Sequence, residues 1–159
     1  MNLRPITLAD WPHILAIQLE CYPQIEPESL EVLQSKWQAS PDSCFVIELD
    51  NNIIGYCLAH PWLLDNPPSL EQQLSQIEQA NTLYLHDIAL SAKAQGKGAG
   101  KQALAKLINF ANSNHFANIS LVAVQGAHHY WGKQGFMTKP ISKDLSAYPA
   151  DARYMVYTL

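Results

Sequence analysis

The stretch from Tyr84 to Leu104 constrains the fold of this chain more than any other. It reads YLHDIALSAKAQGKGAGKQAL, an apolar run suited to a strand, then three glycines in five positions, then a segment with helical apolar spacing. Glycines between a strand and a helix allow positive φ angles and let the backbone approach a ligand closely. A strand-like run at residues 119–124 follows, so the segment predicts a right-handed strand–helix–strand unit.

The rest of the sequence predicts that this unit belongs to one mixed α/β domain spanning residues 1–159. Strand patterns cover residues 2–6, 43–49, 53–59, 82–90, 119–124, 136–138 and 153–158. Helix patterns cover residues 7–21, 28–38, 98–114 and 128–133, with a further short helix from Ser69 that carries Leu70, Leu74 and Ile77 on one side. No repeat or linker pattern divides the chain.

Composition excludes several classes of protein. The chain is 48% hydrophobic and 15% charged, which predicts a real core. No apolar run reaches the ~18–20 residues of a membrane span, and the first residues lack a signal-peptide plan, so we expect a cytoplasmic protein and no membrane partner. Three cysteines without CxxC spacing predict reduced thiols. The adjacent His128 and His129 cannot face one metal on a helix, so no metal site is expected.

Charge is distributed very unevenly along the chain. The net charge of -4 argues against nucleic acid as the main partner. Residues 88–143 nevertheless contain seven lysines and no acid, whereas the remainder carries all fourteen acids and three basic residues. A cationic block around a glycine turn predicts an anionic ligand there. A solvated basic surface is the alternative interpretation.

Two common phosphate-binding motifs do not fit the glycine turn. A Walker A loop needs GxxxxGK[ST], and the stretch from Gly96 to Gln102 is one residue short and lacks the hydroxyl for magnesium. A dinucleotide fingerprint needs GxGxxG with an acid about twenty residues later. Lys101 occupies the position of the last glycine, and no acid follows at that distance.

What remains is the hexamer Gln95-Gly96-Lys97-Gly98-Ala99-Gly100, which resembles the Q/R-x-x-G-x-G/A signature of the GCN5-related N-acetyltransferase (GNAT) superfamily. A second block, from Ala127 to Phe136, matches that family's AxxFYxxxGF pattern in order and spacing. The order of predicted elements also agrees over nearly the whole chain. The resemblance implies the GNAT fold: a mixed, mostly antiparallel sheet of six to seven strands, flanked by helices, with a central parallel pair that splays apart.

The resemblance implies acetyl-CoA as the donor substrate and assigns residues to it. The pyrophosphate is expected at the start of the helix that follows the glycine turn, where free N–H groups and the helix dipole favour an anion. The pantetheine arm is expected in the splayed gap, bonded to the strand at Ile88, Ala89 and Leu90. The other predicted contacts are Gln95, Gly96, Lys97, Gly98, Ala99, Gly100, Lys101, Gln125 and Trp131.

His86 is the predicted catalytic base. Acetyl transfer needs a neutral amine, and an alkyl amine has a pKa near about 10, so a base has to remove its proton. In a regular strand, Tyr84, His86 and Ile88 share one face and Asp87 points the other way. The segment from Tyr84 to Leu90 is similar to the HLHxLAV strand of the arylalkylamine branch, whose two path histidines fall on His86 and Tyr84. A buried histidine bonded to a carbonyl is the alternative, and Asp87 is either an orienting partner or a strand-end residue.

The general acid is where the sequence departs from the family. The tyrosine of AxxFYxxxGF falls on Trp131, whose indole N–H cannot act as an acid. Tyr130 lies one residue early, about 100° away on a helix. Three interpretations follow: the thiolate leaves unaided, another phenol such as Tyr148 or Tyr154 serves, or the helix shifts so that Tyr130 becomes catalytic.

The acceptor side is expected at residues 10–37 and 60–80, with Tyr22, His60 and Trp62 as substrate contacts. Aromatic and acidic residues there, including Glu20, Glu26 and Glu28, suit a cationic amine. We therefore expect acetylation of a small primary amine, aromatic or polyamine, and the sequence leaves a homodimer open. A protein N-terminal or lysine acetyltransferase and a non-catalytic acyl-CoA sensor are the rival hypotheses.

Overall fold

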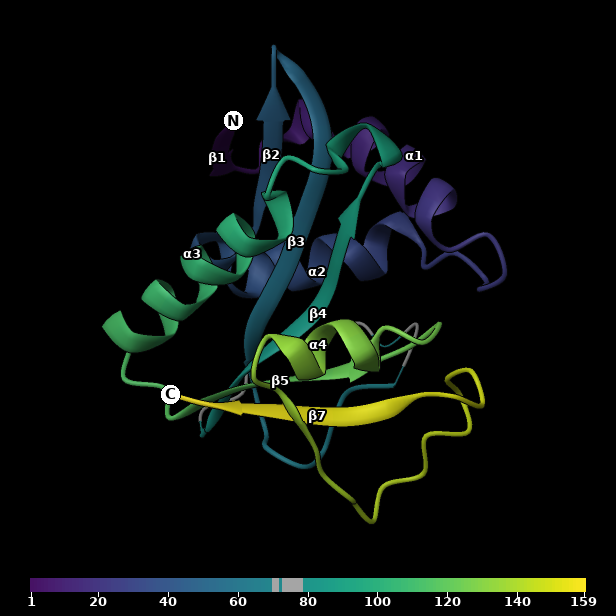
Figure 1. The fold of residues 1–159 in the computed structure, drawn as a ribbon, viewed down its shortest axis with the longest axis vertical. Helices are drawn as coiled ribbons and strands as arrows, with labels where there is room; N and C mark the ends of the chain where they lie inside the picture. The colour runs from purple at the N-terminus through teal and green to yellow at the C-terminus, as the bar shows by residue number, and fades with distance from the viewer. Residues whose placement is uncertain (70–71, 73–78) are drawn as a thin grey trace.

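One mixed seven-stranded sheet organises the computed structural model of this chain, which describes residues 1–69, 72 and 79–159 (Figure 1). The strand order is β1-β2-β3-β4-β5-β7-β6, and β4 and β5 are the parallel pair. This confirms the predicted fold class. The strands are β1 (Asn2–Pro5), β2 (Phe45–Leu49), β3 (Asn52–Trp62), β4 (Thr82–Leu90), β5 (Asn118–Ala123), β6 (Met137–Thr138) and β7 (Arg153–Thr158).

Helices cover both faces of the sheet (Figure 1). The α-helices are α1 (Trp11–Cys21), α2 (Leu30–Ala39), α3 (Ala99–Ser113) and α4 (His128–Lys133), and 3-10 turns occupy Leu8–Asp10, Pro41–Ser43 and Ala92–Ala94. One apolar core joins the sheet to α3 and α4, and a second joins it to α1 and α2. The short helix predicted from Ser69 lies largely outside the described residues. Within the described chain, no helix is long and apolar enough to cross a membrane.

Strand β3 continues through Pro61, where the sequence predicts a strand end. Its pairing with β2 stops at Cys57, but its pairing with β4 continues to Trp62. Beyond Cys57 one side of β3 has no ladder partner among the described strands, and a proline without an N–H is tolerated at such an edge. The extension carries His60 and Trp62 to the start of β4.

The parallel strands β4 and β5 separate soon after they meet. Only two residue pairs are in register, Leu83 with Ile119 and Tyr84 with Ser120. Figure 1 shows the two strands diverging beyond this point. At the closed end the buried hydroxyls of Thr82 and Ser120 are 2.9 Å apart. The divergence opens a gap in the centre of the sheet.

Because of a bulge in β4, its side chains do not point to the faces of the sheet that a regular strand predicts. The register with β3 pairs Leu58 with Asp87 but Ala59 with Leu85, so His86 is the extra residue. A bulge shifts the alternation of side chains by one position. Ile88 therefore packs in the core with Leu85, while Asp87 faces the same cavity as His86. The prediction that Asp87 points to the opposite face is wrong, because it assumed a regular strand.

Candidate active site

Three cavities follow one another from the glycine turn through the strand gap. The first, which we call the turn cavity, measures about 510 Å³ and lies at the start of α3. The second, the gap cavity, measures about 170 Å³ and lies between the diverged strands. The third, the acceptor cavity, measures about 80 Å³ and is reached from the loop after α1. Neighbouring cavities share lining residues, so the three lie next to one another in a row.

The turn cavity has the features of an anion cradle. Gly96 and Gly98 have φ angles of 74° and 72°, which side chains rarely adopt, and a Cβ at either would meet open space. Gly98 caps α3, so the N–H groups of its first turn lie beside the cavity, and that turn contains no acid. Predicted cofactor residues that line it are Ile88, Leu90, Gln95, Gly96, Gly98, Ala99, Gly100, Lys101 and Trp131.

The remaining predicted cofactor residues lie in different places. Gln125 lines the gap cavity, and its side chain donates to the carbonyl oxygen of Cys21 at 3.4 Å. Lys97 is exposed and is not a lining residue of the turn cavity. Ala89 is buried in the core on the α1 and α2 side of the sheet. Its side chain therefore faces away from the turn cavity, and only its backbone is available to a ligand.

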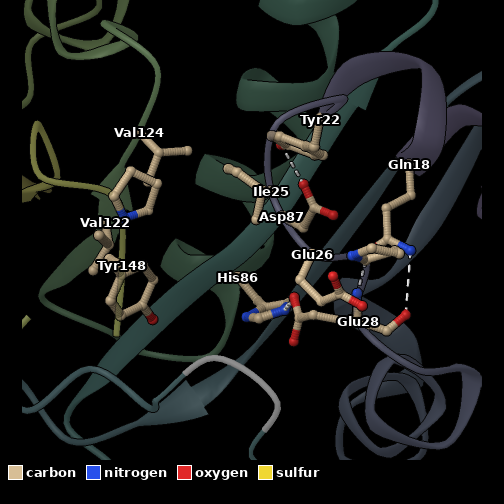
Figure 2. A pocket seen from close by; sticks show the side chains of 12 residues that line it. Gln18, Tyr22, Ile25, Glu26, Glu28, His86, Asp87, Val122, Val124 and Tyr148 are labelled. Carbon is tan, nitrogen blue, oxygen red and sulfur yellow. Dashed lines mark hydrogen bonds and ion pairs between the residues drawn. The ribbon is translucent and has the colours of Figure 1, made fainter. Parts of the chain in front are cut away.

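His86 is in close contact with the side chain of Glu28 in the acceptor cavity. Its Nε2 is 2.7 Å from Oε1 of Glu28, and the two side chains are 3% and 10% exposed. Figure 2 shows the opposite ring nitrogen pointing away from Glu28, toward the side of the cavity that holds Tyr148. The carboxylate that orients His86 is thus Glu28, on the loop before α2, and not Asp87.

Asp87 instead binds two phenols. The hydroxyl of Tyr22 donates to Oδ1 at 2.6 Å, and the hydroxyl of Tyr56 donates to Oδ2 at 2.5 Å. Burial raises the pKa of the Asp87 carboxyl above its usual value. Burial beside Asp87 also raises the pKa of both phenols, so Tyr22 and Tyr56 stay protonated at neutral pH. The cluster is a carboxyl group held between two hydroxyl groups.

Tyr84, His60 and Trp62 form an aromatic cluster behind His86. The Tyr84 ring lies 6.4 Å from the His86 ring, and its hydroxyl is 3.5 Å from that of Tyr148. His60 lies between Tyr84 and Trp62, with ring separations of 5.6 and 5.5 Å. Burial lowers the pKa of His60 to about 3, so its imidazole is neutral. Of the three predicted acceptor contacts, Tyr22 lines the acceptor cavity, and His60 and Trp62 do not.

Helix α4 presents Tyr130 and Trp131 to the turn cavity. Trp131 is buried against Phe136 and also lines the gap cavity. Tyr130 is 41% exposed, and a Cβ built on Gly100 would be 2.6 Å from its hydroxyl oxygen. That hydroxyl therefore lies at the start of α3, and not in the acceptor cavity.

Sequence reasoning did not find two of the contacts at this site. The sequence indicates Glu28 only as one of several acids on the acceptor side. It indicates Tyr56 only as part of a strand segment, residues 55–62, that is similar to the substrate side of the arylalkylamine branch. The Glu28 carboxylate reaches His86 across 58 positions, and the Tyr56 hydroxyl reaches Asp87 across 31. No local spacing signals such pairs. The bulge that turns Asp87 toward them also leaves no pattern in the sequence.

Comparison with known proteins identifies the family. The model of the Acetyltransferase (GNAT) family matches residues 11–136. No curated protein is significantly similar in sequence. Three similar solved structures illustrate the fold. The loading GNATL domain of CurA from Lyngbya majuscula has a TM-score of 0.81 at 17% identity, over 99% of this chain and 96% of that one. A GNAT family acetyltransferase from Elizabethkingia anophelis with acetyl-CoA bound has a TM-score of 0.68 at 18% identity, over 99% of this chain and 97% of that one. Chaetomium thermophilum Naa20, in complex with a bisubstrate analogue, has a TM-score of 0.72 at 17% identity, over 100% of this chain and 87% of that one.

The family match covers most of the chain and includes both motifs, with helix α3 and strand β5 between them. The turn cavity, with its open glycines and acid-free helix start, fits the pyrophosphate of a coenzyme A donor. The chain belongs to the GNAT family, and it is an acyltransferase whose donor is acetyl-CoA.

Proposed function

We propose that the protein acetylates a small primary amine that carries no carboxylate, with His86 as the base. The lining of the acceptor cavity carries this proposal. Three carboxyl side chains line it, Glu26, Glu28 and Asp87, and no lysine or arginine is among its described lining residues. A cationic amine is attracted to the carboxylates of Glu26 and Glu28, whereas the carboxylate of an amino acid meets like charge there.

His86 is placed to prepare the amine for attack. An Nε2 proton donated to Glu28 leaves Nδ1 free to accept a proton from a substrate in the cavity. Glu28 holds the ring in one orientation, as the third member of a catalytic triad does. Tyr22 and Tyr148 add aromatic surface to the same cavity, which suits an organic cation. The similarity of residues 84–90 to the arylalkylamine branch supports aromatic amines as first candidates.

Release of free thiol from acetyl-CoA, measured against matched acceptor pairs, tests the proposal. Each pair contains an amine and its amino-acid counterpart, such as phenethylamine with phenylalanine and putrescine with ornithine. We expect kcat/KM to be at least about tenfold higher for the amine of each pair.

Two outcomes would contradict the proposal. A preference for peptides with a free N-terminus or for lysine side chains would favour a protein acetyltransferase. Tight binding of coenzyme A with no turnover on any amine would favour a non-catalytic sensor. Calorimetry with coenzyme A, run alongside the acceptor panel, separates the second outcome from a simple loss of donor binding.

A further inference from the structure

The leaving sulfur needs a proton, and helix α4 does not supply it in the family's usual way. Trp131 stands at the position where the resemblance places an acidic tyrosine, and its indole N–H is a donor but not an acid. The Tyr130 hydroxyl lies against Gly100 at the far end of the turn cavity. The hydroxyls of Tyr148 and Tyr154 are bonded to backbone groups outside the gap cavity.

Tyr22 stands where the donor and the amine meet. It lines both the gap cavity and the acceptor cavity, and no other described tyrosine lines both. His86 and Asp87 are shared by the same two cavities. If the proposed function holds, the thioester arrives through the gap and the amine through the acceptor cavity. The thioester carbon and the amine nitrogen then meet beside the residues that the two cavities share.

We propose, resting on the proposed function, that the Tyr22 hydroxyl protonates the departing sulfur and that Asp87, backed by Tyr56, supplies and positions that proton. The amine nitrogen forms a bond to the acetyl carbon, and His86 takes one proton from the nitrogen. The carbon–sulfur bond breaks, and its electron pair goes to sulfur. Tyr22 gives its proton to sulfur while the Asp87 carboxylic acid gives its proton to the Tyr22 oxygen. After the transfer, His86 releases its proton to solvent and Asp87 takes one up from solvent, so one turnover of a neutral amine moves one proton, net, from nitrogen to sulfur.

The geometry of the phenol–carboxyl cluster accommodates this relay. The 2.6 Å separation of Tyr22 Oη and Asp87 Oδ1 is a short hydrogen bond that serves with the proton on either oxygen. After the transfer, Asp87 is a carboxylate that accepts hydrogen bonds from both Tyr22 and Tyr56. Two such bonds stabilise a buried anion. The relay requires Asp87 to be a carboxylic acid before the transfer, and burial shifts the pKa of Asp87 in that direction.

Titration of the thiol of bound coenzyme A tests the role of Tyr22 without any acceptor. The fraction of thiolate is followed by its ultraviolet absorbance across pH in wild type, Tyr22→Phe and Tyr157→Phe. We expect Tyr22→Phe to raise the pKa of the bound thiol by about one unit, as the loss of one hydrogen bond to an anion does. Tyr157 lines none of the three cavities, so its variant is the matched control for removing a hydroxyl.

An unchanged thiol pKa in Tyr22→Phe, with the affinity for coenzyme A intact, would overturn the proposal. If Tyr22→Phe does not fold, a fluorinated tyrosine at position 22 keeps the ring and hydroxyl and makes the phenol more acidic. The fluorinated variant should then lose activity at a lower pH than wild type on the high-pH side of the kcat-against-pH profile. A high-pH side at the same position as in wild type would overturn the proposal. If wild type binds coenzyme A but acetylates no amine, the proposed function fails, while the thiol titration still decides whether Tyr22 contacts the sulfur.

The relay itself is tested by combining variants. Asp87→Asn keeps the size of the side chain but has no acid proton to pass on. We expect Asp87→Asn and Tyr22→Phe each to lower kcat about 100-fold, and the double variant to be no slower than the slower single variant. Losses that multiply in the double variant would show that the two side chains act independently, and would overturn the relay.

Discussion

At the scale of single residues, the imidazole of His86 and the carboxylate of Glu28 meet at the wall of the acceptor cavity (Figure 2). The strand sequence identifies the histidine as a base candidate, because its side-chain type is the one that exchanges protons near neutral pH. Its partner comes from a different element, the loop between α1 and α2. Two variants test the two members of this pair separately.

His86→Ala should lower kcat more at about pH 6.5 than at about pH 9. Fewer amine molecules are neutral at the lower pH, so the base is needed more there; the expected loss at the lower pH is about 100-fold. Steady-state kinetics at saturating amine measure it. His13→Ala, at an exposed position on α1, is the control. A loss that is independent of pH would count against the base role.

Glu28→Gln should lower kcat roughly tenfold, since the imidazole loses the carboxylate that orients it. The affinity for coenzyme A, measured by calorimetry, should stay unchanged because Glu28 lines only the acceptor cavity among the three. The exposed Glu31→Gln on α2 removes one negative charge nearby and serves as control. Equal losses in both variants would mean that general charge, and not the contact with His86, is responsible.

At the scale of elements, the start of α3 and the divergence of β4 from β5 border the turn cavity and the gap cavity, which we propose as the donor path. Gly98 in the left-handed conformation ends the turn and begins the helix. The divergence begins after two paired residues, so the gap cavity opens directly beside the bulge at His86. The proposed donor path therefore leads to His86, the proposed base.

Gly98→Asp should abolish binding of coenzyme A. The left-handed backbone at this position disfavours a side chain, and the added carboxylate lies where the phosphates are expected. Calorimetry with coenzyme A measures the loss. Gly132→Asp introduces the same charge at an exposed position of α4 that has ordinary backbone geometry. Unchanged affinity in Gly98→Asp would remove the turn cavity as the phosphate site.

At the scale of the whole molecule, the first strand is fixed to the sheet and to the first helical turn by one charge cluster. Arg4 donates to both carboxylate oxygens of Asp10 at 2.8 Å and to Glu48 on β2 at 2.8 Å. The backbone N–H of Thr7 also donates to Asp10, at 2.7 Å. The guanidinium of Arg4 lowers the pKa of Asp10 to about 2 from its ordinary 3.8.

Asp10→Asn should therefore destabilise the protein in a pH-dependent manner. A lowered pKa in the folded state contributes stability that is complete above the unfolded pKa of 3.8 and is lost as pH falls through about 2. The expected loss at neutral pH is about 1–2 kcal/mol, reduced from the full shift because Arg4 is partly exposed to solvent. Denaturant unfolding at several pH values measures it, with the exposed Asp42→Asn as control. An equal difference at all pH values would contradict the charge-based explanation.

The sequence alone determined the fold class, and it predicted the donor half of the site. Both depend on local patterns: alternation and helical spacing define the elements, and the glycine turn from Gln95 to Gly100 lies at the end of the cavity path where we expect the phosphates. Each element is defined by residues close together in the chain, so its signal survives without knowledge of the packing.

Only the tertiary structure decided the acceptor half. The bulge at His86 turns Asp87 into the acceptor cavity, although strand periodicity directs it to the other face. The extension of β3 through Pro61 depends on where β2 stops, and the partners of His86 and Asp87 come from distant loops and strands. These contacts are set by the register and meeting of separate elements, and register is a property of a pair of strands that neither strand encodes by itself.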